Sequence, residues 1–164
     1  MLNVVARAKQ ACPIQCALKL TSTDFGFPVG AKVEYTDPMT NSVKFINVAF
    51  NLTVSDFLRP VPGMAVAQFG QQWQTPGMVE RKLSIPNSTA RSAEAFMQKC
   101  QMFGIQPIQA IGTEAVAVGK LISLNMAVLM HGKTGPALEV LIRTSDKTLS
   151  ETLQAAVRNG GAFN

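Results

Sequence analysis

The sequence predicts an α+β fold, in which a partial antiparallel β-sandwich precedes a platform of antiparallel sheet flanked by helices. Residues 1–58 contain short runs that alternate apolar and polar side chains, a pattern typical of half-buried strands. Residues 59–164 mix helix-like and strand-like runs and end in an amphipathic helix. We therefore expect two subdomains, a sandwich over 1–58 and a platform over 59–164.

Strands are expected throughout the first subdomain. Residues 16–21 and 31–35 alternate, residues 37–41 supply turn formers, and a long alternating run follows over 43–54. A sandwich of this size leaves an open sheet edge that is prone to pairing. We therefore expect either that the chain is truncated on its N-terminal side or that a second copy supplies the missing strands.

Two helices are expected early in the platform. Pro60, Pro62 and Gly63 end the strand pattern, and a helix is predicted over 65–74. A connector containing prolines follows. A second helix is predicted to begin near Ser88, with Asn87 or Ser88 as its cap, and to end at Gly104. Its apolar stripe is expected in the core and comprises Ala93, Phe96, Met97, Cys100 and Phe103.

Four strands and a closing helix complete the predicted platform. The strands are expected near 105–111, 115–121, 125–130 and 137–143. Ser145 and Asp146 are placed to cap the final helix, and Gly160 marks its end. The buried face of that helix is expected to contain Leu149, Leu153, Ala156 and Val157.

The composition indicates a globular chain without a metal or cofactor. Of 164 residues, 47% are hydrophobic and 15% are charged, and no apolar run reaches the length of about 18 residues that a membrane span needs. The first ten residues lack the apolar core of a secretory signal, so we expect a cytoplasmic protein. Cys12, Cys16, Cys100 and His131 are too scattered for a zinc site or a disulfide framework. The net charge of +5 is spread singly along the chain, which argues against nucleic-acid binding.

Three short blocks of the sequence are informative, namely Phe57–Pro60 (FLRP), Phe69–Trp73 (FGQQW) and Leu138–Ser145 (LEVLIRTS). Together they resemble the appendage, or ear, of the large subunits of heterotetrameric clathrin adaptors. The first two are similar to the junction between sandwich and platform in the alpha type, and the third is similar to the last platform strand. Residues 108–116 (IQAIGTEAV) are similar instead to the epsilon type, whose complex works at the trans-Golgi network.

The resemblance implies a protein-interaction module without catalytic residues, peripheral on coated vesicle membranes at a coated pit or the trans-Golgi network. Its partners would be other adaptor subunits and accessory proteins of endocytosis or intracellular transport that carry short aromatic motifs. The implied peptide-binding residues are Trp73, Phe69, Gln72 and Arg143. On the residues alone, Trp73 is either a core residue or an exposed anchor. Gly70 stands where the alpha type has a pocket aromatic residue.

The alpha type also reads the acidic residue of its motif with two arginines. Glu139 and Val128 fall at or near those positions in this chain, so the resemblance does not carry over specificity for motifs of the Asp-Pro-Phe kind.

An alternative function is nucleotide binding by residues 127–134 (AVLMHGKT). This segment fits the loose pattern of a phosphate-binding loop with Lys133 as its lysine. Such a loop needs flexible residues and a helix that begins at the lysine. Bulky residues precede Gly132, and Pro136 follows, so residues 132–136 are predicted to form a hairpin turn instead.

Overall fold

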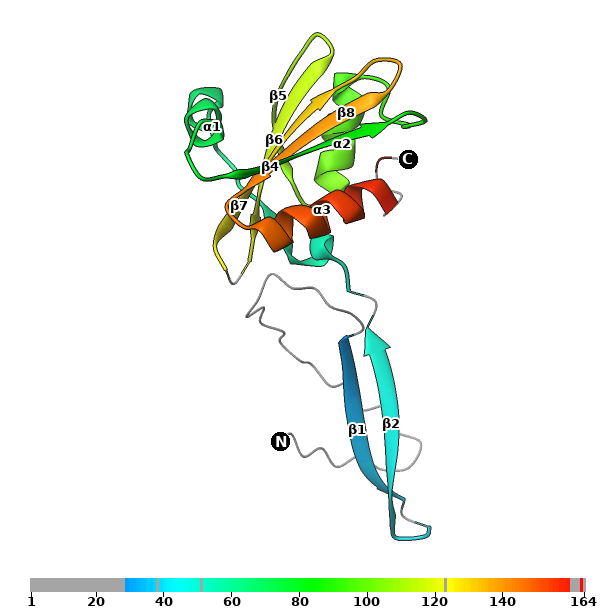
Figure 1. Ribbon diagram of the computed structural model, residues 1–164. Coiled ribbons are helices and arrows are strands. Elements are labelled where there is room, and N and C mark those ends of the chain that lie inside the picture. Colours follow the sequence, from blue (N-terminus) through cyan, green and yellow to red (C-terminus); the bar gives the residue numbers. More distant parts are fainter. Residues whose placement is uncertain (1–28, 38, 51, 123, 160–162, 164) are drawn as a thin grey trace.

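The chain forms an N-terminal hairpin followed by a six-stranded antiparallel sheet with helices on both faces (Figure 1). The computed structural model describes residues 29–37, 39–50, 52–122, 124–159 and 163. The predicted α+β class, with an antiparallel sheet flanked by helices, is confirmed. The part of the predicted sandwich that lies within the described residues is a single hairpin.

That hairpin consists of β1 (Val29–Asp37) and β2 (Ser42–Phe50), which pair along their full length. The predicted turn is confirmed, since the Met39 amide donates to the Asp37 carboxylate at 2.9 Å. The strand predicted over 43–54 ends earlier than expected, at Phe50, and a 3-10 turn, η1, is present at Val54–Phe57. The strand predicted over 16–21 lies outside the described residues, and the subdomain boundary after residue 58 stays a prediction.

The main sheet has the order β3-β6-β7-β8-β4, and β5 also pairs with β6. Its strands are β3 (Leu58–Pro60), β4 (Val79–Ile85), β5 (Gln106–Ile111), β6 (Glu114–Leu121), β7 (Met126–Lys133) and β8 (Leu138–Thr144). β3 and β5 share one side of β6, because β3 lies opposite residues 119–121 and β5 opposite residues 114–118.

Strand β4 lies in the segment between the first two helices, for which the sequence predicted only a connector containing prolines. The apolar–polar alternation of β4 is interrupted because Arg81 lies on the same side of the strand as Leu83. The Arg81 guanidinium donates to the Glu151 carboxylate on the last helix at 2.7 Å. β4 also stands at the end of the strand order, where charged residues are common because they discourage pairing with other chains.

The helices are α1 (Val66–Trp73), α2 (Ala93–Met102) and α3 (Lys147–Asn159). The predicted first and last helices are confirmed, and Asp146 caps α3 by accepting from the Leu149 amide at 2.7 Å. The predicted start of α2 near Ser88 is wrong. Ser92 is the cap and accepts from the Ala95 amide at 3.2 Å, whereas the Ser88 hydroxyl donates to the Phe163 carbonyl.

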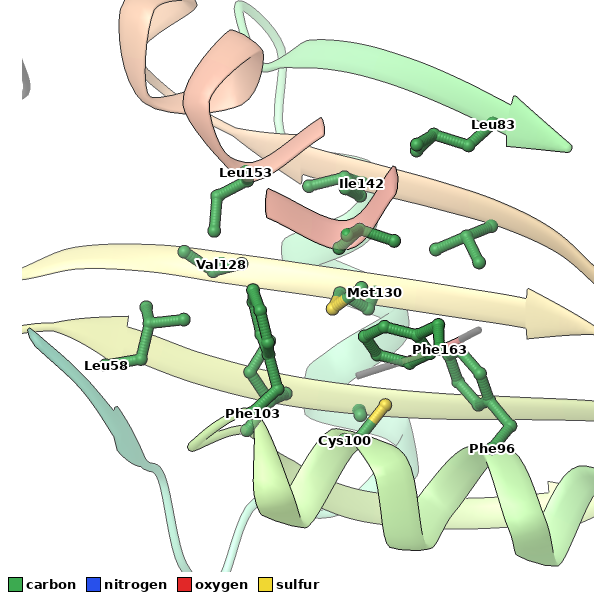
Figure 2. Close-up of a cluster of buried hydrophobic side chains, with 14 of the residues drawn as sticks. Leu58, Leu83, Phe96, Cys100, Phe103, Val128, Met130, Ile142, Leu153 and Phe163 are labelled. Atoms are coloured by element: carbon green, nitrogen blue, oxygen red, sulfur yellow. The ribbon is translucent and has the colours of Figure 1, made fainter. Parts of the chain in front are cut away.

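Alternate residues of the central strands enter two separate cores. Val128 and Met130 of β7 face α2 and α3, where Phe96, Cys100, Phe103 and Leu153 are buried (Figure 2). Leu129 faces the opposite way, into a smaller cluster under α1. The sheet is therefore covered by α2 and α3 on one face and by α1 on the other.

We predict that Gly132→Ala destabilises the platform. A Cβ at this β7 position would lie 2.6 Å from carbons of the Phe96 ring, so α2 or the ring must move. Overpacking of this kind costs about 1–3 kcal/mol, measurable as a lower free energy of unfolding in urea.

Gly70→Ala is the matched control for Gly132→Ala. A Cβ there would meet nothing within 4 Å. Alanine in a helix interior is favoured over glycine by about 0.5–1 kcal/mol, so stability should stay constant or rise. Equal losses in both variants would contradict the packing argument.

Candidate functional site

A groove of about 400 Å³ lies between α1 and the β5–β6–β7 part of the sheet. Most of its lining is apolar, and its charged or titratable lining residues are one carboxylate and one imidazole. The lining residues are Val66, Phe69, Gly70, Trp73, Gln74, Gln109, Ile111, Glu114, Ala115, Val116 and His131. Val66 and Ile111 leave large apolar side chains exposed at the groove.

Two aromatic rings of α1 form one wall of the groove. Phe69 and Trp73 are four residues apart and therefore share a helix face. Their rings stack with centroids 5.5 Å apart and planes 28° from parallel. Phe69 is buried against Val118 and Leu129 of the sheet, whereas Trp73 is only half-buried. Trp73 thus packs on the core and also presents its indole to the groove.

Arg143 lies behind the indole, on β8. Its guanidinium carbon is 5.4 Å from the Trp73 ring centroid, and its Nη1 donates to the Trp73 carbonyl at the end of α1. Its Nε lies 3.8 Å from the Glu80 carboxylate, and the side chain is only 18% exposed. A cation at the C-terminus of a helix binds a carbonyl that has no partner within the helix and interacts favourably with the helix dipole. Arg143 therefore anchors α1 to the sheet.

Gln72 lies apart from this groove. It lines a second hollow of about 390 Å³, together with residues of the β3–α1 loop and two further glutamines of α1. Its Oε1 is buried and has no hydrogen-bond partner among the described residues. The structure thus brings Phe69 and Trp73 together in the groove, with Arg143 supporting them and Gln72 on a different face of α1.

A hydrogen-bonded trio of titratable residues at the groove is not evident from the sequence. The Glu114 carboxylate contacts His131 Nε2 at 3.2 Å and Lys133 Nζ at 3.4 Å. The imidazole also meets the Trp73 ring edge-on, with centroids 6.0 Å apart and planes at 87°. The hydrogen bond from Lys133, followed by that from His131, lowers the pKa of Glu114.

Strand register explains this trio. Glu114 lies opposite Lys133 and Val116 lies opposite His131, so side chains of one face converge from β6 and β7. The sequence signal was present as a spacing of two between His131 and Lys133, but the partner Glu114 becomes visible only when the two strands are paired.

The structure contradicts the alternative of a phosphate-binding loop at residues 127–134. Residues 126–133 form β7, which pairs with β6 on one side and β8 on the other. Lys133 ends a strand rather than beginning a helix, so its backbone amides do not form an anion cradle. The predicted hairpin turn is present but begins at Thr134, two residues later than the predicted start at Gly132.

A known protein family matches the segment of the chain that contains the groove. The family model of the adaptin AP4 complex epsilon appendage platform matches residues 63–159. The chain belongs to this appendage platform family. The match confirms the adaptor appendage resemblance and is to the epsilon type rather than the alpha type. No curated protein matches the chain.

Appendage platforms are protein-interaction modules of adaptor complexes in vesicle trafficking. The matched residues include α1 and all strands that line the groove, so the groove is part of the family's platform. Within the described ranges, no helix is long and apolar enough to span a membrane.

Burial raises the pKa of the Cys100 thiol, which lies in the core of the platform.

We predict that Arg143→Met loosens α1 of the appendage platform without unfolding the sheet. Methionine keeps part of the aliphatic stem but loses the bond to the Trp73 carbonyl, a charged hydrogen bond worth about 1.5–3 kcal/mol. Amide exchange of α1 should accelerate while exchange in β7 and β8 stays slow.

Arg81→Met is the matched control for Arg143→Met. Its guanidinium donates to Glu151 of α3 on the opposite face, so α1 should exchange as in the wild type. Unchanged α1 exchange in Arg143→Met would remove the anchoring role of Arg143.

We also predict that Glu114 contributes to acid sensitivity. Its pKa is lowered from 4.5 in the folded state, so its stabilising effect is present above that value. The effect is lost as the pH falls through the lower folded pKa. The stability difference between wild type and Glu114→Gln, from urea unfolding, should therefore shrink on acidification. A difference that stays constant down to the acid limit of folding would contradict this assignment.

Proposed function

We propose that this appendage platform recruits accessory proteins by binding their short aromatic peptide motifs in the groove under α1. One observation carries the proposal, the half-buried indole of Trp73 stacked on Phe69 in an apolar groove. Trp is enriched among the residues that contribute most to binding at interfaces, because it is large, rigid and able to donate one hydrogen bond.

The size and rim of the groove suit such a motif. A volume of about 400 Å³ is within the range of small-ligand sites and accommodates a few side chains rather than a folded surface. Ile111, which is 68% exposed, and Val66 extend the apolar surface beyond the rings. A peptide laid across α1 and β5 would cover them both.

Modest affinity fits a coat protein. Binding in the range from tens of micromolar to micromolar corresponds to about −6 to −8 kcal/mol. Several weak sites on one coat act together through effective concentration, so each remains reversible. We propose that the module acts without chemistry of its own, on the cytoplasmic side of coated membranes and alongside other adaptor subunits. The epsilon-type match supports the trans-Golgi network over a plasma-membrane coated pit.

We predict that Trp73→Ala abolishes measurable motif binding while the sheet stays folded. The experiment is a heteronuclear NMR titration of the labelled chain with aromatic peptides, following the Trp73 indole signal in the wild type. Shifts should localise to α1, β5 and β6 in the wild type and disappear in the variant.

Met102→Ala is the matched control for Trp73→Ala. Met102 is 76% exposed on α2, which covers the opposite face of the sheet, so the variant should bind as the wild type does. A folded Trp73→Ala protein with undiminished binding would exclude the groove as the site.

A further inference from the structure

We infer that Glu114 and His131 make the groove selective for aromatic motifs whose adjacent residue donates a hydrogen bond and carries no negative charge. The inference rests on the proposed function and adds the chemical class of the peptide to it. It follows from the orientation of the imidazole, from the bonds that Glu114 already makes, and from the charges that line the groove.

The imidazole is held in one tautomer. A carboxylate can only accept hydrogen bonds, so the His131 Nε2 that lies 3.2 Å from Glu114 carries the proton. In the neutral ring, Nδ1 is then a hydrogen-bond acceptor. Among the described residues, no donor is bonded to Nδ1, and the side chain is 28% exposed in the groove. A peptide hydroxyl or N–H is the complementary group.

Glu114 orients this acceptor from the neighbouring strand. One carboxylate oxygen contacts His131 and the other contacts Lys133 at 3.4 Å. Glu114 is therefore a positioning residue for the imidazole, which in turn lies edge-on against the Trp73 indole. The acceptor and the aromatic wall are adjacent, so one dipeptide unit of a motif can contact both.

The groove offers an acidic peptide residue no free cation. No arginine or lysine is among its lining residues in the described part of the chain. Arg143 is engaged with the Trp73 carbonyl and Glu80, and Lys133 with Glu114. An aspartate beside the aromatic residue would face the Glu114 charge and the lone pair of Nδ1. Both are repulsive, so the motif read by arginines in the alpha type is disfavoured here.

The test uses three synthetic peptides that differ in one residue. They are capped Gly-Gly-Phe-Xaa-Trp-Gly-Gly peptides with Ser, Ala or Asp as Xaa, titrated calorimetrically into the full chain at pH 7.5. Serine should bind about three- to tenfold more tightly than alanine, the size of one net hydrogen bond. Aspartate should bind most weakly.

Three variants separate the two residues. His131→Phe should retain apolar binding and remove the preference for serine over alanine. Glu114→Gln should reduce the penalty for aspartate. Glu139→Gln is the matched control, because Glu139 pairs with Lys82 at 3.3 Å on the same sheet face but does not line the groove, so the wild-type ranking should persist.

The outcomes separate a failure of the selectivity from a failure of the proposed function. If all three peptides bind the wild type equally and shift the Trp73 signal, the groove binds aromatic motifs but the selectivity is overturned. Tighter binding of the aspartate peptide at pH 7.5 also overturns it. If none of the peptides binds, the proposed function fails and the selectivity fails with it. The comparison among peptides on the wild type needs no variant to fold.

Discussion

The antiparallel register of β6, β7 and β8 is the constraint on which the rest of the molecule depends. Because successive side chains of a strand point to opposite faces, β7 supplies Val128 and Met130 to the main core and Leu129 and His131 to the α1 side. A shift of one residue would place the imidazole among α2 side chains and leave Met130 in the groove. Folding and the site therefore rest on the same pairing.

The two faces of this sheet differ in how strongly they are covered. α2 and α3 bury a continuous cluster that includes Phe96, Leu153 and Phe163 (Figure 2). α1 is eight residues long and is held by Phe69, the half-buried indole and the bond from Arg143. A short helix contributes little stability of its own, so tertiary contacts hold it in place. Its incomplete coverage leaves the apolar groove beside it.

Local patterns in the sequence predicted the elements whose periodicity is unbroken. The stripe of α2 and the cap of α3 are recognisable because burial and capping act over a few residues. β4 was missed because Arg81 interrupts its inward face and pairs with α3, which lies 70 residues away in sequence. Likewise, the aromatic pair of α1 follows from helical spacing, but the contacts of Arg143 with α1 need the folded sheet.

The strand register also determines which carboxylates lie beside the positively charged side chains near the groove. The chain carries a net charge of +5, which by itself favours acidic partners. Pairing of β6 with β7 nevertheless directs Lys133 onto Glu114, and pairing of β8 with β4 places Arg143 beside Glu80. Lys133 and Arg143 are thus each paired with a carboxylate of a neighbouring strand. The net charge affects how fast partners associate with the chain. The groove itself discriminates between peptides by ring stacking and by one imidazole acceptor.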